Sequence, residues 1–496
     1  MLKRSDLAHI VRHAGFDVVG NIISMALMFV SGVIITRTIG ADPYGKYSIA
    51  NSILIFTSVI AIFGMETGVV KIASKYIAKS EPSRALGTLA SGILLVGSIA
   101  TGITIGILMF SPLIAAKAFP NVEGMTWVIR VLIVALPFLS LTTMINAYTR
   151  SFKTLKYTVF VESLARPVLR LVLILAMFKM GLRLEAVLYG SVVSFLIGAF
   201  LSFRSAISLS RARLGNFKPR RVTRELFTYS VPVAAAHITS AVLLHANTLI
   251  VGHYKDSLDT GLFSIAAQLS SYISISLYSF AKIFSPIASD LWERQKIDDL
   301  GETLKTVSKW IFAIGFLLFS VIMVLAPSIL AIFGDEFKDA ANSFRILATG
   351  QIINAVGALI GYLLPMTGKQ KLYLVNYCIF ATLMILLNIL MVPRWGIVGA
   401  SLATCLSGLI CTSTFIIESK IVYGFTPLRR DFVTPIYAGV LTGLILYSFD
   451  HMAHVSSTTQ GTLAMCVVAT GIYGLLLYKL GFKEEKDILL AAIKRK

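Results

Sequence analysis

Fourteen apolar runs, separated by short connections, constrain the fold of this chain more than any other feature. An α-helix needs about 20 mostly apolar residues to cross the hydrocarbon core of a bilayer, so each run predicts one membrane-spanning helix. The runs lie near residues 15–36, 47–69, 86–110, 126–148, 158–178, 185–203, 227–252, 262–284, 308–333, 342–366, 372–392, 397–419, 433–449 and 461–479.

The composition agrees with a membrane protein. Of 496 residues, 56% are hydrophobic and 14% are charged, whereas about a quarter of the residues in a soluble domain are charged. No connection between runs approaches the roughly 50 residues of a separate soluble domain. We therefore expect an all-α polytopic membrane protein. The same figures exclude a disordered chain, a coiled coil and an ordinary soluble enzyme.

The basic residues are distributed unevenly between the two predicted sides. The formal net charge is +20, from 45 Lys and Arg against 25 Asp and Glu. With the N-terminus placed inside, 33 of the 45 basic residues fall on the cytoplasmic side, 8 fall outside and 4 lie within spans. This bias follows the positive-inside rule and predicts that both termini are cytoplasmic. It accounts for the positive charge without nucleic acid. We expect no cleavable signal peptide, because the first residues show no short apolar core with an A-x-A cleavage site.

An internal repeat predicts the architecture. Gly45–Ala50 reads GKYSIA and Gly261–Ala266 reads GLFSIA, at an offset of 216 residues; Arg130 and Arg345 open equivalent helices at an offset of 215. We expect two homologous six-helix lobes around a central cavity, related by an axis along the membrane normal. The predicted parts are an N-lobe (1–206), a basic cytoplasmic linker (207–226), a C-lobe (227–420) and an added helix pair with a basic tail (421–496).

The fifth predicted helix places three ionisable residues inside the membrane. Glu162, Arg166 and Arg170 follow i, i+4, i+8 spacing and share one face, and Pro167 predicts a kink among them. Such residues usually face a partner or a wet cavity. Two interpretations remain open. Glu162 and Arg166 form an ion pair that serves helix packing, or the arginines form a cationic patch suited to bidentate phosphate contact.

The eighth predicted helix carries a polar stripe, which Ile275 interrupts. Its members are Ser264, Gln268, Ser271, Tyr272, Tyr278, Ser279 and Lys282. Serines also occur off the stripe, at positions 270, 274 and 276. Hydroxyl groups serve helix packing in bilayers, but so long a polar face also suits a water-filled cavity. Both interpretations stay open.

Four further residues are candidates with structural alternatives. Arg130 and Arg345 lie about one turn into helices 4 and 10 from the outer surface, where they either face the cleft or extend to the interface. His237 and His245 in helix 7 are either structural histidines or a protonation switch.

Two acids lie near the inner surface. Asp17 and Glu66 could hold a coupling cation or accept a proton. Equally they could pair with Lys71 or Lys75, and we favour that pairing.

Motifs of soluble enzymes are missing from the sequence. It contains no G-x-x-x-x-G-K-[ST], H-E-x-x-H or G-x-S-x-G. The four cysteines lie in apolar runs without metal-ligand spacing. We expect no catalytic residues, no cofactor and no metal, and hence not an enzyme. A glycan polymerase or ligase would also need a sizeable external loop, and no predicted loop is long enough.

Two local sequences carry a resemblance to a known family. They are TIGADPYGKYS at 38–48 and Asn388 followed by VPRWGIVGASLAT at 392–404. With fourteen spans in two lobes, they resemble the polysaccharide-transporter family of lipid-linked oligosaccharide flippases, the type that exports O-antigen units. That family belongs to the multidrug/oligosaccharidyl-lipid/polysaccharide exporter superfamily. Its other branches include multidrug antiporters and lipid II flippases.

The resemblance implies a function. A relative of these proteins moves an undecaprenyl- or dolichyl-pyrophosphate-linked glycan across the inner membrane of a prokaryote by alternating access, and works beside glycan polymerase or assembly proteins. The candidate cavity residues are Arg166, Arg170, Arg130, Arg345, Gln268, Ser271, Tyr272 and Ser279. The candidate coupling or ion-pair residues are Glu162, Asp17, Glu66 and His237. Many relatives have an acid late in helix 7, where this chain has Asn247, which weakens a cation site there.

Two alternatives share this architecture. A lipid II-type precursor flippase also has fourteen spans, and differs only in its substrate. A cation-coupled multidrug antiporter would more typically have twelve spans and an acidic cavity. The added helix pair and the four arginines within spans argue against the antiporter.

Overall fold

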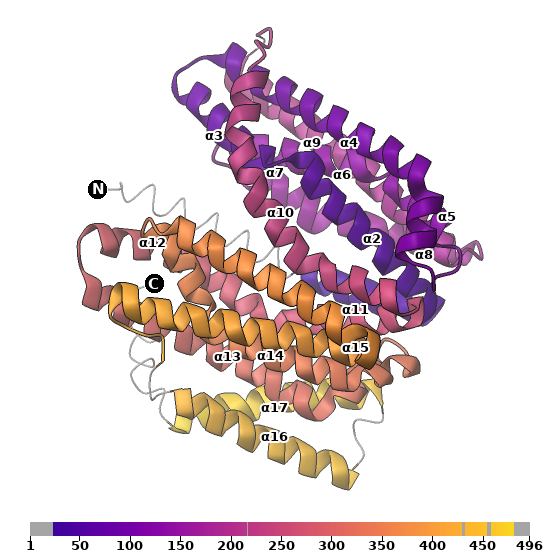
Figure 1. Ribbon diagram of the computed structural model, residues 1–496, viewed down its shortest axis with the longest axis vertical. Helices are drawn as coiled ribbons and strands as arrows, with labels where there is room; N and C mark the ends of the chain where they lie inside the picture. The colour runs from indigo at the N-terminus through magenta and orange to yellow at the C-terminus, as the bar shows by residue number, and fades with distance from the viewer. Residues whose placement is uncertain (1–22, 216, 429–431, 454–457, 481–496) are drawn as a thin grey trace. The chain divides into compact units, whose positions relative to one another are not determined.

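The computed structural model describes residues 23–215, 217–428, 432–453 and 458–480, and all regular structure in these ranges is helical, with no strand. The first helix, Ile23–Ile39, precedes the labelled elements. These continue as α2 (Ala41–Ile62), α3 (Met65–Ala78), α4 (Pro82–Ala118), α5 (Met125–Ile133), α6 (Leu136–Arg150), α7 (Lys156–Thr158), the π-helix η1 (Val159–Ala165), α8 (Arg166–Lys179), α9 (Leu184–Leu214) and α10 (Thr223–Tyr254) (Figure 1).

The later elements are helical as well. They are α11 (Ser257–Ser271), the 3-10 helix η2 (Tyr272–Ser274), α12 (Ile275–Glu293), α13 (Ile297–Ala331), the 3-10 helix η3 (Asp335–Ala340), α14 (Ala341–Met366), α15 (Gln370–Tyr423), α16 (Val433–Ala453) and α17 (Thr459–Leu480).

The described residues account for the fourteen predicted spans. Ten stretches are long and apolar enough to cross a membrane, and one of them, α15, contains two helices joined at Gly396. The remaining predicted spans are the shorter helix Ile23–Ile39, the η1–α8 segment and the broken α11–α12 segment. The predicted all-α membrane architecture is confirmed.

The chain forms two compact units, residues 1–261 and 262–496, which are considered separately below. In the first unit, α10 packs against α2, α3 and α4. The chain passes into the second unit within α11. The predicted division differs: with a linker at 207–226 and a C-lobe that begins at residue 227, it places α10 with the later helices. That division into lobes stays a prediction.

The first unit has its core where α3, α4 and α6 meet. Val69, Val96, Met144 and Tyr148 are among the buried side chains of this cluster. Gly64 separates α2 from α3 with φ +70°, and a Cβ added there would lie 2.7 Å from the carbonyl oxygen of Ser230 in α10. Only glycine satisfies both the backbone angle and the close approach.

The repeated glycines face each other across a helix crossing in the first unit. A Cβ on Gly45 would lie 1.7 Å from the carbonyl oxygen of Ser257, and one on Gly261 would lie 2.1 Å from that of Ala41. Each glycine therefore meets the residue four positions before its repeat equivalent. Small residues at such spacing let membrane helices approach closely. The two segments that are related by the offset of 216 residues thus contact each other in a nearly symmetric way.

The second unit is arranged around α13. Both α16 and α17 pack on this helix (Figure 1), in a cluster formed by Val321, Leu325, Leu446, Met465 and Ala469. The Tyr473 hydroxyl donates a hydrogen bond to the Ala313 carbonyl oxygen over 2.8 Å. The C-terminal pair predicted from the sequence is therefore attached to α13.

Two glycines fold α15 back on itself. Gly396 has φ 56° and ψ −135°, outside the helical region. A Cβ on Gly399 would lie 2.4 Å from the Met391 carbonyl oxygen, so the turn closes tightly. Both glycines belong to the WGIVGAS sequence. They convert one apolar stretch into a hairpin of two spans.

Candidate functional site

The fifth predicted span does not continue as a regular α-helix through its charged residues. The π-helix η1 ends immediately before Arg166 and Pro167, and the Arg166 N–H donates to the Val161 carbonyl oxygen, five residues back. Proline has no N–H and disturbs the regular ladder in front of it. Single π turns inside helices frequently occur at functional sites. The kink predicted at Pro167 thus takes the form of a widened turn that precedes both arginines.

Glu162 lies in η1 and binds an amide, with no ion pair to a cation among the described residues. Its Oε1 accepts a hydrogen bond from Asn146 Nδ2 over 2.7 Å. The buried hydroxyl of Ser202 donates to Asn146 Oδ1 over 2.9 Å. This chain links α6, η1 and α9. One oxygen of Glu162, the acid that one interpretation of the sequence pairs with Arg166, is therefore hydrogen-bonded to Asn146.

The Arg166 guanidinium lies against α9. Its Cζ is 5.1 Å from the centroid of the Phe195 ring. A Cβ added to Gly198 would come within 3.7 Å of Arg166 Cδ, so glycine leaves room for the side chain. A cation is attracted to the face of an aromatic ring, which positions it without neutralising it.

The Arg170 guanidinium lies against α2. Its Nη2 donates to the Tyr47 hydroxyl over 2.8 Å, and its Cζ is 5.3 Å from the centroid of the same ring. Its Nε is buried without a hydrogen-bond partner. Neither Arg166 nor Arg170 forms an ion pair with any carboxylate in the described part of the chain. With Glu162, the three groups keep a net positive charge.

Arg130 and Arg345 make equivalent contacts in their own units. Arg130 Nε donates to Ser111 Oγ over 2.8 Å, and Arg345 Nε donates to the Met323 carbonyl oxygen over 3.0 Å. Each arginine thus bonds to the preceding long helix, α4 or α13. Arg130 is exposed and Arg345 is half-buried. The similarity agrees with the repeat, and their role in a shared cleft stays a prediction.

The polar stripe of the eighth predicted helix is divided by a break. The 3-10 turn η2 separates α11 from α12, so the stripe drawn on one continuous α-helix is interrupted. Gln268 Nε2 donates to the Tyr272 hydroxyl over 3.3 Å. Ser271 is exposed, whereas Ser270 is buried. The side chain of Ser279 lies outside the described part of the structure.

Glu66 has a different partner from the predicted ones. Its Oε1 lies 2.7 Å from Arg150 Nη2, an ion pair between α3 and α6. The prediction of a Lys71 or Lys75 partner is wrong. Lys75 pairs with Glu225 of α10 over 2.8 Å, and Lys71 lies over a tyrosine ring of the same helix. Lys71 is five residues from Glu66, which places the two on different faces of one helix.

The remaining candidates form no cluster with these groups in the described residues. His237 and His245 are half-buried on α10. Asp17 lies outside the described residues. No group of three or more His, Cys, Asp or Glu that could hold a metal ion occurs in the ranges that the structure covers. The aromatic and polar surroundings of the arginines, from Tyr47 to Asn146, were not predicted from the sequence.

Family models place the chain in a known group. The model described as polysaccharide biosynthesis protein matches residues 10–292, and the MatE model matches residues 232–391. The chain therefore belongs to the polysaccharide biosynthesis protein family. The resemblance to lipid-linked oligosaccharide flippases of the exporter superfamily is confirmed.

Curated relatives are distant in sequence. A probable low-salt glycan biosynthesis flippase, Agl15 of Haloferax volcanii, is 24% identical over 299 residues, which is 54% of this chain and 61% of that protein. An uncharacterised membrane protein of Methanocaldococcus jannaschii is 22% identical over 289 residues, 56% of this chain and 55% of its own length. The chain thus spans little more than half the length of these relatives.

Solved structures share the fold. The lipid II flippase MurJ in an inward closed conformation superposes with a TM-score of 0.75 at 15% identity, covering 95% of this chain and 99% of that one. A multidrug resistance transporter of the MATE family, inward-facing, gives 0.68 at 12% identity, covering 81% and 94%. At these identities the likeness establishes the fold alone.

Proposed function

We propose that this protein is a flippase that moves a polyprenyl-pyrophosphate-linked oligosaccharide from the cytoplasmic to the outer leaflet. Family membership and the glycan flippase among the relatives support this class of activity. The observation that carries the proposal is the pair Arg166 and Arg170, two guanidinium groups in a membrane-spanning segment that have no carboxylate partner in the described residues.

The pair suits a diphosphate for a physical reason. Each guanidinium has five N–H donors in a planar fork that matches phosphate oxygens. Arg170 donates to Tyr47, and Arg166 makes no hydrogen bond from its side chain to a described residue, so most donors are free. Away from bulk water an ionic contact is stronger than at a surface. A diphosphate can therefore replace the missing counter-charge.

The surrounding groups set the geometry of this anion site. Phe195 and Tyr47 support the two guanidiniums from α9 and α2, and neither ring competes as an anion. Asn146 holds the only carboxylate of the segment, Glu162, by a hydrogen bond. This bond holds one oxygen of Glu162 on Asn146, and the site stays cationic because two arginines outnumber this single carboxylate.

The rest of the substrate fits the same scheme. The glycan is large and polar and needs a hydrated path. The polar residues Gln268, Ser271 and Tyr272 of α11 and η2 are our candidates for its lining, and Arg130 and Arg345 are further candidates. The lipid tail stays in the bilayer. Two six-helix lobes that open alternately to each side would move the head group without energy from a nucleotide, since the chain has no phosphate-binding loop.

The membrane and the orientation belong to the same proposal. The excess of basic residues on one predicted side supports cytoplasmic termini, and a glycan flippase of this family would work in the inner membrane of a prokaryote beside glycan polymerase or assembly proteins. The chain itself acts as a transporter and not as an enzyme. A lipid II-type precursor is the alternative substrate, because the lipid II flippase MurJ has the same fold and the fold alone does not select the substrate.

Deletion of the gene in its host tests the function directly. Lipid-linked intermediates and surface glycan are analysed together in the deletion strain and in a complemented strain. Accumulation of a pyrophosphate-linked oligosaccharide, with loss of the surface glycan, is the expected result and identifies the substrate. Unchanged glycans together with altered sensitivity to cationic drugs would contradict the proposal and favour an antiporter.

A further inference from the structure

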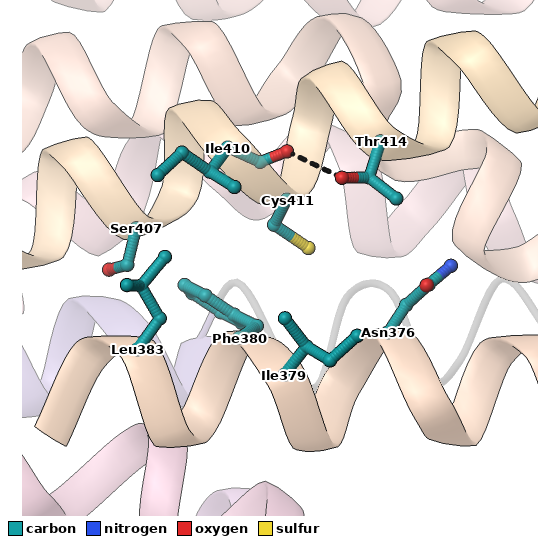
Figure 2. Close-up of a pocket in the computed structure, with 8 residues that line it drawn as sticks. All are labelled: Asn376, Ile379, Phe380, Leu383, Ser407, Ile410, Cys411 and Thr414. Carbon is teal, nitrogen blue, oxygen red and sulfur yellow. Dashed lines mark hydrogen bonds between the residues drawn. The ribbon is translucent and has the colours of Figure 1, made fainter. Parts of the chain in front are cut away.

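A narrow trough lies between the two helices of the α15 hairpin in the second unit. It is lined by Asn376, Ile379, Phe380, Leu383, Ser407, Ile410, Cys411 and Thr414 (Figure 2). Asn376 and Glu418 lie on opposite sides of the turn at Gly396 and are joined by a hydrogen bond from Nδ2 to Oε2 over 2.5 Å. Their pairing fixes the register of the two helices at one end of the trough.

The sequence explains why a trough remains here. Ser407, Cys411, Thr414 and Glu418 recur at i, i+4, i+7 and i+11, so they share one helix face. Three of these side chains are small and do not fill the space opposite Phe380. In Figure 2 the Cys411 thiol points into this gap between the helices.

The inner surface of the trough is mainly apolar, although several of the residues that line it have polar side chains. The Ser407 hydroxyl donates to the Ala403 carbonyl oxygen over 2.6 Å. The Thr414 hydroxyl donates to the Ile410 carbonyl oxygen over 2.9 Å (Figure 2). These hydroxyls satisfy their hydrogen bonds within their own helix, as is common in membrane helices. The inner surface offers a ligand mainly carbon contacts.

The trough is shallow and narrow. Its interior volume is about 30 Å³, far below the roughly 300 Å³ at which drug-sized pockets begin. A glycan or a multi-ring drug is therefore too large to enter, whereas a slender hydrocarbon chain can lie along the open mouth and contact the lining side chains.

The end of the trough carries a negative charge. Glu418 lies one turn beyond Thr414 and is half-buried, and α15 ends five residues later, at Tyr423. Its Oε2 accepts from Asn376, and among the described residues no cation pairs with the carboxylate. A lipid head group at this level would meet a carboxylate, which attracts an ammonium group and repels a diphosphate.

We propose that this trough binds one acyl chain of a bilayer aminophospholipid whose ammonium group contacts Glu418. Charge complementarity selects this occupant over the tail of a polyprenyl diphosphate and over an anionic phospholipid. The site is separate from the arginines of α8. It would hold a structural lipid on the α15 hairpin whether or not the proposed transport activity is correct.

Photo-crosslinking in reconstituted membranes tests this site. The purified full chain is placed in nanodiscs with a phosphatidylethanolamine or a phosphatidylglycerol, each carrying the same diazirine acyl chain. Labelled peptides are located by mass spectrometry. We expect the ethanolamine lipid to label the segments 376–383 and 407–414 roughly tenfold more than the glycerol lipid, the factor that one charge-assisted hydrogen bond provides.

Three variants separate the head group from the chain. Glu418→Gln should bring the two lipids to similar labelling. Thr414→Leu fills the trough and should lower labelling by both lipids, whereas Ser413→Leu, on the exposed neighbouring position, should change neither. Size-exclusion profiles check that each variant is folded. Equal labelling by both lipids in the unmodified protein would overturn the proposal. So would displacement of the ethanolamine lipid by an equimolar polyprenyl diphosphate, or labelling that Thr414→Leu leaves unchanged.

Discussion

Asn146 donates a hydrogen bond to Glu162, with Nδ2 and Oε1 2.7 Å apart, and this contact leaves Arg166 without the acid nearest to it in sequence. The two residues lie on different elements, α6 and η1. Asn146 is 1% exposed and also accepts a hydrogen bond from Ser202. The orientation of the carboxylate that precedes the α8 arginines therefore depends on a neutral amide one helix away.

Replacing Asn146 with alanine should destabilise the protein. The change removes the donor to Glu162 and the acceptor of Ser202, and leaves both groups without these partners. Loss of a buried hydrogen bond typically costs about 1–3 kcal/mol. Thermal unfolding of the purified protein in detergent measures the effect. Asn121→Ala, at an exposed position, is the matched control. Equal melting temperatures for the two variants would argue against a structural role of this hydrogen-bonded chain.

The crossing of the repeated glycines should tolerate no side chain. In Gly45→Ala the new methyl group would meet the Ser257 carbonyl oxygen at 1.7 Å, so the helices must separate. Overpacking of this kind costs typically 1–3 kcal/mol. Gly106→Ala in α4 is the control, because nothing lies within 4 Å of its Cβ position. A lower melting temperature for the first variant alone is expected, and a similar value for both would contradict this description.

The ion pair between Glu66 and Arg150 should show modest coupling. Both side chains are about one third exposed, at 29% and 30%, so solvent screens the attraction. A double-mutant cycle with Glu66→Gln and Arg150→Gln should give a coupling free energy of about 1 kcal/mol, near the upper end for exposed pairs. Denaturant unfolding of the four proteins measures it. A coupling indistinguishable from zero would show that the pair has no energetic role.

The proposed hydrated lining makes a prediction for α11. Single cysteines are placed at positions 271 and 270 in a cysteine-free background, and each is treated with a small, membrane-impermeant thiol reagent in inside-out and right-side-out vesicles. The cysteine at position 271 should react at a rate well above that of the cysteine at position 270. Ser271 is exposed and Ser270 is 1% exposed. The exposed native Cys378 must be replaced, because it would add background. Equal protection of both positions would count against a wet face on this helix.

Much of the fold follows from local sequence. Runs of about 20 apolar residues define spans because the bilayer sets the length of a crossing helix. The break at Gly396 and the repeat at Gly45 and Gly261 are visible as short motifs. Such features depend on residues that are close in sequence or on a repeat at a fixed spacing. They can be predicted without knowing which helices are in contact.

The surroundings of the candidate site were not predicted, because they depend on contacts between helices that are far apart in the sequence. Glu66 was expected to pair along its own helix, yet Arg150 reaches it from α6. Tyr47 and Phe195, which support the arginines, are ordinary apolar-face residues in the sequence. Partner choice across helices depends on crossing angle and depth, which one sequence does not specify. The widened turn η1 also required the structure, because a proline predicts a kink without its form.

The most direct test of the central proposal replaces both α8 arginines. The variant Arg166→Gln/Arg170→Gln keeps a polar side chain at both positions but removes both positive charges and three of the five N–H donors of each residue. Arg84→Gln is the control, since Arg84 is on the surface and pairs with Glu81. Each lost charge-assisted contact to phosphate costs about 1.5–3 kcal/mol, so binding of a polyprenyl diphosphate should weaken at least about a hundredfold.

The decisive measurement is therefore the level of lipid-linked oligosaccharide and surface glycan in a deletion strain that expresses each variant at equal membrane abundance. The account predicts that Arg166→Gln/Arg170→Gln accumulates the pyrophosphate-linked intermediate and loses the surface glycan, while Arg84→Gln behaves as the unmodified protein. Normal glycan display by the double variant would contradict the assignment of these arginines to the diphosphate.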